Sequence, residues 1–424
     1  MNNDSTGHNK QDMQNISFKT IIANKQFRLL WLLGGLTSCM RWLDMLILGI
    51  YTFELTNSAF LVGLIFFYRT IPRLLFGTIV GIITDRFNRK VILLISFIVL
   101  SFTYALVALL IYSETINYSL LSITMFIAGI CWANEFPVRR AMIGDVIPNK
   151  VAGKAFGIDI GTSAFTRIIG PALGGGILAT LGPVTGYLTV CIVFLIASLI
   201  CLQVKSTNTH LMNQTDKKTL SSFIVDIKDA LQYIKDNKLL QGTMAVTVVM
   251  NFFAFPYFNM VPVIGKEVLE VNPFQIGLLG AIEGTGALIG ASFIATKINF
   301  ANYAKVYFFG SIFLTFCIFS FANSSIYLLS MLILFIAGFG MVSFATMQTT
   351  LTIVSTSPEM RGRTMGALSL AIGAGPVGSL LIGTLASSFG TQNGIMIVSF
   401  LGFAAMIITG YIWPDIRKKI TEQQ

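Results

Sequence analysis

The chain has 424 residues, of which 54% are hydrophobic and only 11% are charged, and its formal net charge is +10. Soluble domains carry about 25% charged residues, so this composition excludes an ordinary soluble protein and indicates a chain that crosses a membrane many times. The positive residues are distributed along polar links between apolar runs, and this distribution does not indicate nucleic-acid binding.

The first residues are polar and lack the apolar stretch of a signal peptide, so we expect a cytoplasmic tail there. Twelve apolar runs follow, each about long enough to cross a bilayer as a helix. They lie at about 27–52, 59–83, 90–112, 117–142, 152–180, 184–204, 240–263, 274–297, 304–322, 325–350, 363–388 and 394–414. The sequence therefore predicts an all-α polytopic membrane protein with twelve transmembrane helices in two six-helix halves.

The longest link between runs covers residues 205–239 and is rich in Lys. Its apolar residues from Phe223 to Leu240 have helical spacing, which predicts an amphipathic helix on the membrane surface. The expected divisions are an N-terminal tail, a six-helix bundle, this linker, a second six-helix bundle and a C-terminal tail, at 1–26, 27–204, 205–239, 240–414 and 415–424.

The distribution of Lys and Arg among the links predicts the orientation. With the N-terminus inside, the links on the outer side contain Lys266 alone, whereas the inner links and the tails contain the others, apart from six arginines within the apolar runs. Positively charged links remain on the cytoplasmic side, so both termini and the linker are expected there.

A dense group of charges separates the second apolar run from the third. It contains Gly81, Asp85, Arg86, Arg89 and Lys90. Gly81 permits close approach of two helices, and Asp85 can accept hydrogen bonds from helix N-termini or pair with Arg. The three basic residues hold the turn on the cytoplasmic side.

Several charges fall inside the apolar runs, where they are costly and therefore point to function or to structural pairing. Arg41 and Asp44 lie three residues apart on the first predicted helix, and Arg69 and Arg73 lie four apart on the second. This group has more arginines than acids, which leaves room for an anionic group of a substrate. A structural pair between Arg41 and Asp44 is the alternative.

The fourth and eighth predicted helices contain further charges. Glu135 and Arg139 can pair across one helical turn, with Arg140 beside them. Glu283 is the one acid deep in the second half, among glycines, and its apolar surroundings favour the protonated form. It is a candidate proton carrier, or a buried neutral Glu that hydrogen-bonds a neighbouring helix. Between Asp44 and Glu283 we favour Asp44, because a substrate can compete with it for Arg41.

The fifth predicted helix contains Gly170, Pro171, Gly174 and Gly175. Proline removes a backbone hydrogen bond and kinks the helix, and the glycines provide a flat face for close packing. A related stretch, Gly373-Ala374-Gly375-Pro376-Val377-Gly378, lies at the corresponding place in the second half, which supports an internal duplication.

These motifs together resemble the major facilitator superfamily. The group at 81–90 is similar to its loop signature G-x-x-x-D-R-x-x-R-[RK], although Asn88 stands where many members have Gly. The run Gly170 to Gly175 resembles the helix-5 motif of the exporters in this family, with Thr166 in place of a Gly. Arg140-x-x-x-Gly144 is similar to a helix-4 motif linked to proton coupling. Within the family, the chain looks most like bacterial exporters that include the enterobactin exporter and macrolide efflux proteins.

The resemblance implies a secondary transporter of the bacterial cytoplasmic (inner) membrane. We expect proton-coupled export of a small amphipathic molecule, either a siderophore-like metabolite or a drug, by alternating access. Import of an anionic compound on the same fold is the alternative, and a non-transporting receptor or a lipid scramblase is a weaker one. No enzyme activity, cofactor, metal or nucleic-acid partner is expected. The proton gradient is the expected energy source. We expect membrane lipid to surround the protein, and we expect the protein to be monomeric.

Overall fold

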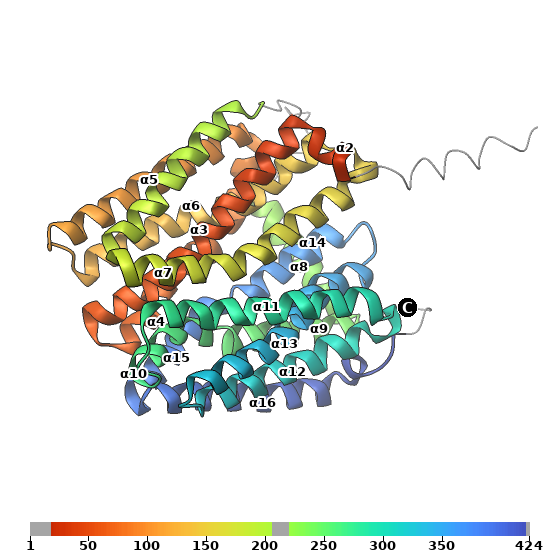
Figure 1. Cartoon of the computed structure of the whole chain (residues 1–424). Coiled ribbons are helices and arrows are strands. Elements are labelled where there is room, and N and C mark those ends of the chain that lie inside the picture. The colour runs from red at the N-terminus through yellow and green to blue at the C-terminus, as the bar shows by residue number, and fades with distance from the viewer. Residues whose placement is uncertain (1–17, 206–219, 421–424) are drawn as a thin grey trace, which may run out of the picture.

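The structure is a computed structural model that describes residues 18–205 and 220–420; within these ranges it leaves out the side chains of residues 18–20, 77–86, 149–150 and 220–224. Every regular element of the described chain is a helix. The long helices run roughly parallel or antiparallel and form two bundles, one from each half of the chain (Figure 1).

The first bundle contains long apolar helices whose ends are capped by polar residues. Asn24, Asn88 and Asn117 each accept a hydrogen bond from a backbone N–H of the first turn, which satisfies donors that have no partner within the helix. Its elements are α2 (Phe18–Ala23), α3 (Lys25–Thr56), α4 (Ala59–Arg86), α5 (Arg89–Tyr112), α6 (Tyr118–Val146) and α7 (Asn149–Gln203).

Helix α7 is long enough for two membrane crossings. It is broken at Gly182, whose φ of 76° is a left-handed value that glycine adopts without strain, and Pro183 follows. The chain therefore reverses there, and α7 accounts for the fifth and sixth predicted spans.

The second bundle is more interrupted. A π-helical segment, η1, lies between α9 and α10, and Gly373 and Ala374, at the start of the Gly-Pro stretch 373–378, separate α14 from α15. Pro376 occupies the first turn of α15, where its missing N–H costs no hydrogen bond. The elements are α8 (Leu220–Lys235), α9 (Lys238–Val249), η1 (Met250–Ala254), α10 (Tyr257–Glu267), α11 (Pro273–Lys297), η2 (Phe300–Asn302), α12 (Tyr303–Ala322), α13 (Tyr327–Val354), α14 (Arg361–Ile372), α15 (Gly375–Phe389), α16 (Thr391–Ile412) and η3 (Pro414–Arg417).

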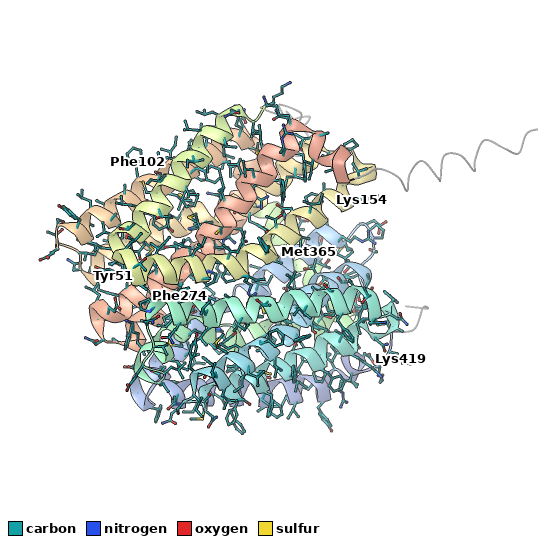
Figure 2. All side chains as sticks on the ribbon, viewed as in Figure 1. Tyr51, Phe102, Lys154, Phe274, Met365 and Lys419 are labelled. Atoms are coloured by element: carbon teal, nitrogen blue, oxygen red, sulfur yellow. The ribbon has the colours of Figure 1, made fainter. Side chains whose placement is uncertain are left out.

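Eleven stretches of the described chain are long and apolar enough to span a membrane, and one of them, Val151–Gln203, contains the two crossings of α7. Large apolar side chains project from the outside of the bundles: Phe102 on α5 is 72% exposed (Figure 2). Such a surface suits lipid. The twelve-helix membrane fold predicted from the sequence is confirmed.

The two halves are in close contact at one end of the molecule. We call the end with α2 and the C-terminus the terminal end, and the end with α10 the far end (Figure 1). At the far end, a Cβ added to Gly63 of α4 would lie 2.5 Å from the carbonyl oxygen of Ser379 on α15. Lys266 of α10 forms an ion pair of 2.6 Å with Glu54 of α3 at this end.

Glycines near the terminal end behave differently. A Cβ added to Gly153, Gly157 or Gly161 of α7 meets no described atom within 4 Å. The close contacts between halves are thus concentrated at the far end, and we conclude that the molecule is closed there.

Helix α8, within the predicted linker, is attached to the second half. Arg363 at the start of α14 forms ion pairs of 2.8 Å with Asp226 and 3.0 Å with Asp229. The Tyr233 hydroxyl accepts a hydrogen bond from the backbone N–H of Ser357 at 3.1 Å. These contacts couple α8 to α14 and to the turn that precedes it.

Candidate functional site

A chain of buried charges connects α3, α6 and α7. Glu135 receives hydrogen bonds from Thr37 (2.9 Å), Arg41 (3.1 Å) and Arg139 (2.9 Å). The Arg139 guanidinium also contacts Asp159 of α7 at 2.5 Å. The pairing of Glu135 with Arg139 across one turn, predicted from their spacing, is confirmed.

Two arginines at the edges of this network are partly exposed and contact aromatic rings. Arg41 lies 4.7 Å from the ring centroid of Trp132, and Arg140 lies 4.2 Å from that of Phe136. Arg140 also contacts Asp159 at 3.3 Å. Aromatic faces stabilise cations in this geometry.

Asp44 belongs to a second, separate cluster. Its carboxylate forms an ion pair with Arg69 of α4 and accepts a hydrogen bond of 2.8 Å from the Tyr104 hydroxyl of α5. Trp132 of α6 donates to the same hydroxyl at 3.2 Å. Asp44 is fully buried and Arg69 nearly so. The cluster thus ties four helices of the first half together.

The structural pair between Arg41 and Asp44, one of the two alternatives that the sequence left open, does not form. The three-residue spacing does put both on α3, but Arg41 turns to Glu135 and Asp44 turns to Arg69. Spacing along one helix cannot indicate these pairs, because Arg41 and Asp44 each have their partner on a neighbouring helix. Tyr104 and Trp132 were missed, because an aromatic residue in an apolar run has no sequence signal that separates it from the core.

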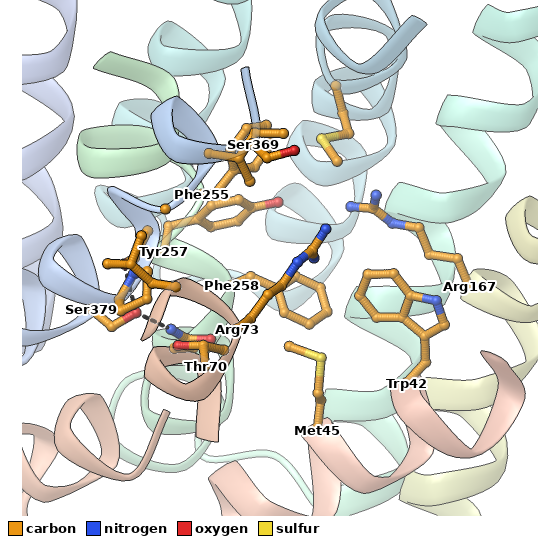
Figure 3. Close-up of a pocket in the computed structure, with 17 residues that line it drawn as sticks. Trp42, Met45, Thr70, Arg73, Arg167, Phe255, Tyr257, Phe258, Ser369 and Ser379 are labelled. Carbon is orange, nitrogen blue, oxygen red and sulfur yellow. Dashed lines mark hydrogen bonds between the residues drawn. The ribbon is translucent and has the colours of Figure 1, made fainter. Parts of the chain in front are cut away.

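A cavity of about 270 Å³ lies between the two halves. Its walls come from α3, α4 and α7 of the first half and from α10, α13, α14 and α15 of the second, with Phe255 between η1 and α10. In Figure 3 the side chains of Arg73 and Arg167 point into the cavity, with Trp42 and Phe258 beside them. Trp42 and Phe258 meet edge to face across the two halves, with ring centroids 5.5 Å apart.

Arg73 is exposed in this cavity and forms no hydrogen bond or ion pair with any residue whose side chain the structure describes. Arg167 is paired: its guanidinium donates to both carboxylate oxygens of Glu283 at 2.9 Å. Glu283 is 1% exposed, and Arg167 lies 4.9 Å from the ring centroid of Trp42. This ion pair joins α7 of the first half to α11 of the second.

The role of Glu283 as a proton carrier stays a prediction. This residue is buried as expected, but it pairs with a cation from the other half. Arg167 was not among the candidate residues, although its position four residues before Pro171 places it close to the glycine-rich motif.

The helix-5 motif packs against helices of both halves. A Cβ added to Gly170 would lie 2.8 Å from the carbonyl oxygen of Cys39 on α3, and one added to Gly174 would lie 2.9 Å from that of Leu43. A Cβ added to Gly175 would lie 2.4 Å from the carbonyl oxygen of Pro273 at the start of α11. The close packing predicted for this motif is present, and it includes the contact between halves.

The charged loop at 81–90 is described only in part. The side chains of Gly81, Asp85 and Arg86 lie outside the described residues. Arg89 contacts both carboxylate oxygens of Asp145 on α6, at 2.9 and 2.7 Å, and the Lys90 ammonium donates to the Leu202 carbonyl at 2.7 Å. Arg89 and Lys90 thus attach this part of the loop to α6 and α7 at the terminal end of the molecule.

No group of three or more His, Cys, Asp or Glu side chains that could hold a metal ion occurs in the described part of the chain. The clusters above contain arginines with carboxylates, and their geometry suits ion pairing and the movement of protons or anions. The nearby aromatic rings suit the apolar body of a small organic molecule.

Known proteins similar to this chain are transporters. The Staphyloferrin A transporter of Staphylococcus aureus is 23% identical over 386 residues, which cover 90% of this chain and 94% of that protein. Macrolide efflux protein A of Streptococcus pyogenes is 21% identical over 87% of this chain and 91% of its own length.

Solved structures of transporters share the fold. A bacterial homolog of the human lysosomal transporter Spinster, in an inward-facing and unoccupied conformation, matches with a TM-score of 0.71 and 15% identity, over 93% of this chain and 98% of that one. A D-xylose-proton symporter matches with a TM-score of 0.70 and 16% identity, over 93% and 99%. The family and fold are those of transporters and not of enzymes. Residues 30–377 match the family described as Major Facilitator Superfamily, and the chain therefore belongs to that superfamily of membrane transporters.

Proposed function

We propose that this secondary transporter exports a small amphipathic molecule across the bacterial cytoplasmic membrane in exchange for protons. The observation that carries the proposal is the cavity between the halves, which combines aromatic walls with the guanidinium groups of Arg73 and Arg167. Small-molecule sites are mostly apolar, with a few convergent polar groups that orient the ligand. In transporters of this kind the two halves rock around a central site.

The expected orientation is compatible with export from the state seen here. The distribution of Lys and Arg favours cytoplasmic termini. In that orientation the closed far end faces outward, so the cavity takes up its ligand from the cytoplasm. A siderophore-like metabolite and a drug remain the two candidate cargoes, because relatives over most of the chain are named for staphyloferrin A transport and for macrolide efflux.

Glu283 is the better candidate for the proton carrier. The reason for favouring Asp44 was competition for Arg41, and Arg41 is bound to Glu135 instead. Asp44 is sealed within the first half, whereas Glu283 joins the two halves through a cavity-lining arginine. Protonation of Glu283 would release Arg167 and weaken a contact that must break when the halves rock.

Import of an anionic molecule is the second candidate. It is favoured by one observation, the unpaired charge of Arg73 in the cavity. Measurements of the direction of transport and of its dependence on protons distinguish the exporter from the importer. The charge of the cargo does not distinguish them, because either protein could carry an anion.

The test is uptake of labelled staphyloferrin A and of a labelled macrolide into right-side-out and inside-out vesicles with imposed pH gradients. Export predicts accumulation of one of these compounds in inside-out vesicles with an acidic interior. Glu283→Gln is expected to abolish accumulation and to retain downhill exchange, whereas Asp44→Asn retains coupling if it folds. Accumulation only in right-side-out vesicles would favour the importer. Full proton coupling in Glu283→Gln would reject the assignment of Glu283 as the proton carrier.

A further inference from the structure

We propose that the cargo carries a carboxylate, and that Arg73 is the residue that binds it. The inference deepens the proposed function and rests on it, because it concerns the cavity assigned there to the cargo. It follows from a comparison of Arg73 with the other intramembrane arginines and from the composition of the cavity wall.

Arg73 differs from its neighbours in having no acidic partner. Each of the other arginines that lie beyond the first turn of a described span contacts a carboxylate: Arg41, Arg69, Arg139, Arg140 and Arg167. Charges at membrane depth are paired or line water. Arg73 lines the cavity, so its guanidinium is available to a ligand.

The cavity wall selects against a cationic ligand. No Asp or Glu is among the described residues that line it. Glu283, the acid behind Arg167, has both oxygens occupied by that arginine. An ammonium group in the cavity would therefore meet two guanidinium groups and no free carboxylate, whereas an anion would be attracted by Arg73, whose charge no carboxylate compensates.

The guanidinium also favours a carboxylate by its shape. Its planar fork matches the two oxygens of a carboxylate and can form two parallel hydrogen bonds. In Figure 3 Phe258 lies next to Arg73 and Trp42 lies beyond it, beside Arg167, so both rings provide apolar area for the remainder of the molecule. The site therefore fits an amphipathic acid whose carboxylate is close to an aromatic or aliphatic body.

Three probes with one fluorophore and different tails test this assignment: dansylglycine, its neutral amide, and a dansyl diamine with a cationic tail. Binding to the purified full-length protein is measured by energy transfer from tryptophan to the dansyl group. We expect dansylglycine to bind at least about tenfold more tightly than the other two, the ratio that about 1.4 kcal/mol produces.

Variants then locate the preference. Arg73→Gln is expected to reduce the preference for the anion to less than about threefold, and Arg73→Lys to retain part of it, because a point charge lacks the fork. Arg28→Gln removes an exposed charge from α3 far from the cavity wall and is expected to change nothing. Melting temperatures of all variants verify folding.

The inference is overturned if wild-type protein binds the three probes equally, if it binds none of them saturably, or if Arg73→Gln keeps the full preference for the anion. Proton-driven transport is measured separately in vesicles. A preference for the anion without any transport would reject the proposed function but support the carboxylate-binding site at Arg73. Transport of the neutral probe, without any preference for the anion, would reject only the proposal that the cargo carries a carboxylate.

Discussion

Closure of the far end depends on the absence of a side chain at Gly175. A Cβ at this position would lie 2.4 Å from the carbonyl oxygen of Pro273 and 3.1 Å from the Cα of Gly277. Both are backbone atoms of α11 and cannot move aside as a flexible side chain can. Gly175→Ala therefore forces α7 and α11 apart and destabilises the closed state.

The size of the effect follows from the cost of overpacking. An extra methyl group in a well-packed interface costs about 1–3 kcal/mol. Because the open far end has no such contact, this cost shifts the equilibrium between the two states by about 5- to 150-fold toward the open one.

Ala59 offers a reporter of that shift. It begins α4 at the far end, is 6% exposed, and its carbonyl oxygen lies 3.2 Å from the position of a Cβ added to Gly383 on α15. In a background without the five native cysteines, Ala59→Cys should react slowly with a membrane-impermeant maleimide. Gly175→Ala should raise this rate by about 5- to 150-fold, in proportion to the open population.

The neighbouring glycine supplies the control. A Cβ added to Gly176 has its nearest contact at 3.7 Å, to a ring carbon of Phe274, which is ordinary van der Waals distance. Gly176→Ala makes the same change in helix propensity and should leave the labelling rate unchanged. Equal rates in the Gly175 and Gly176 variants would show that the inter-half contact does not set the equilibrium.

Two further predictions concern stability and the linker. Asp44→Ala leaves Arg69 buried without its partner, so it should lower the free energy of unfolding by about 3–5 kcal/mol. The double variant with Asp44→Ala and Arg69→Met should recover much of this loss. Thermal unfolding in detergent measures both effects. Arg363→Gln removes both ion pairs to α8, so limited proteolysis should cleave within residues 220–235 faster than in wild type, whereas Arg361→Gln, which is exposed, should not change the rate. An unchanged cleavage pattern in Arg363→Gln would mean that apolar packing alone holds α8.

The sequence predicts the membrane fold well because each span is a local property. An apolar run of sufficient length must form a helix in lipid, since its backbone groups have no other partners. The break at Gly182 was also foreseeable, as a short link between two runs. The π segment at Met250–Ala254 was not, because it lies within one uninterrupted apolar run.

The pairing of charges was predictable only where both partners lie on one helix. Glu135 and Arg139 are four residues apart and meet as expected. Asp44 and Glu283 have partners 25 and 116 residues away in sequence, at Arg69 and Arg167, and composition alone does not say which faces of which helices meet. The cavity likewise collects residues from both halves.

The ion pair between Arg167 and Glu283 leads to a last prediction, because it should affect conformation as well as stability. Its two residues belong to different halves, and both carboxylate oxygens contact the guanidinium at 2.9 Å. Glu283→Gln removes the charge attraction between α7 and α11. The variant should therefore label faster at Ala59→Cys, by about 5- to 150-fold for a coupling of 1–3 kcal/mol.

The pair between Asp44 and Arg69 is the matched comparison, since it is buried too but lies within one half. Its loss weakens the open and closed states alike, so Asp44→Asn should lower the melting temperature without a change in the labelling rate. If both variants raised the rate equally, labelling would report general loosening of the fold. If neither did, Glu283 would not hold the halves together, and a release of Arg167 on protonation would have no conformational consequence to couple with transport.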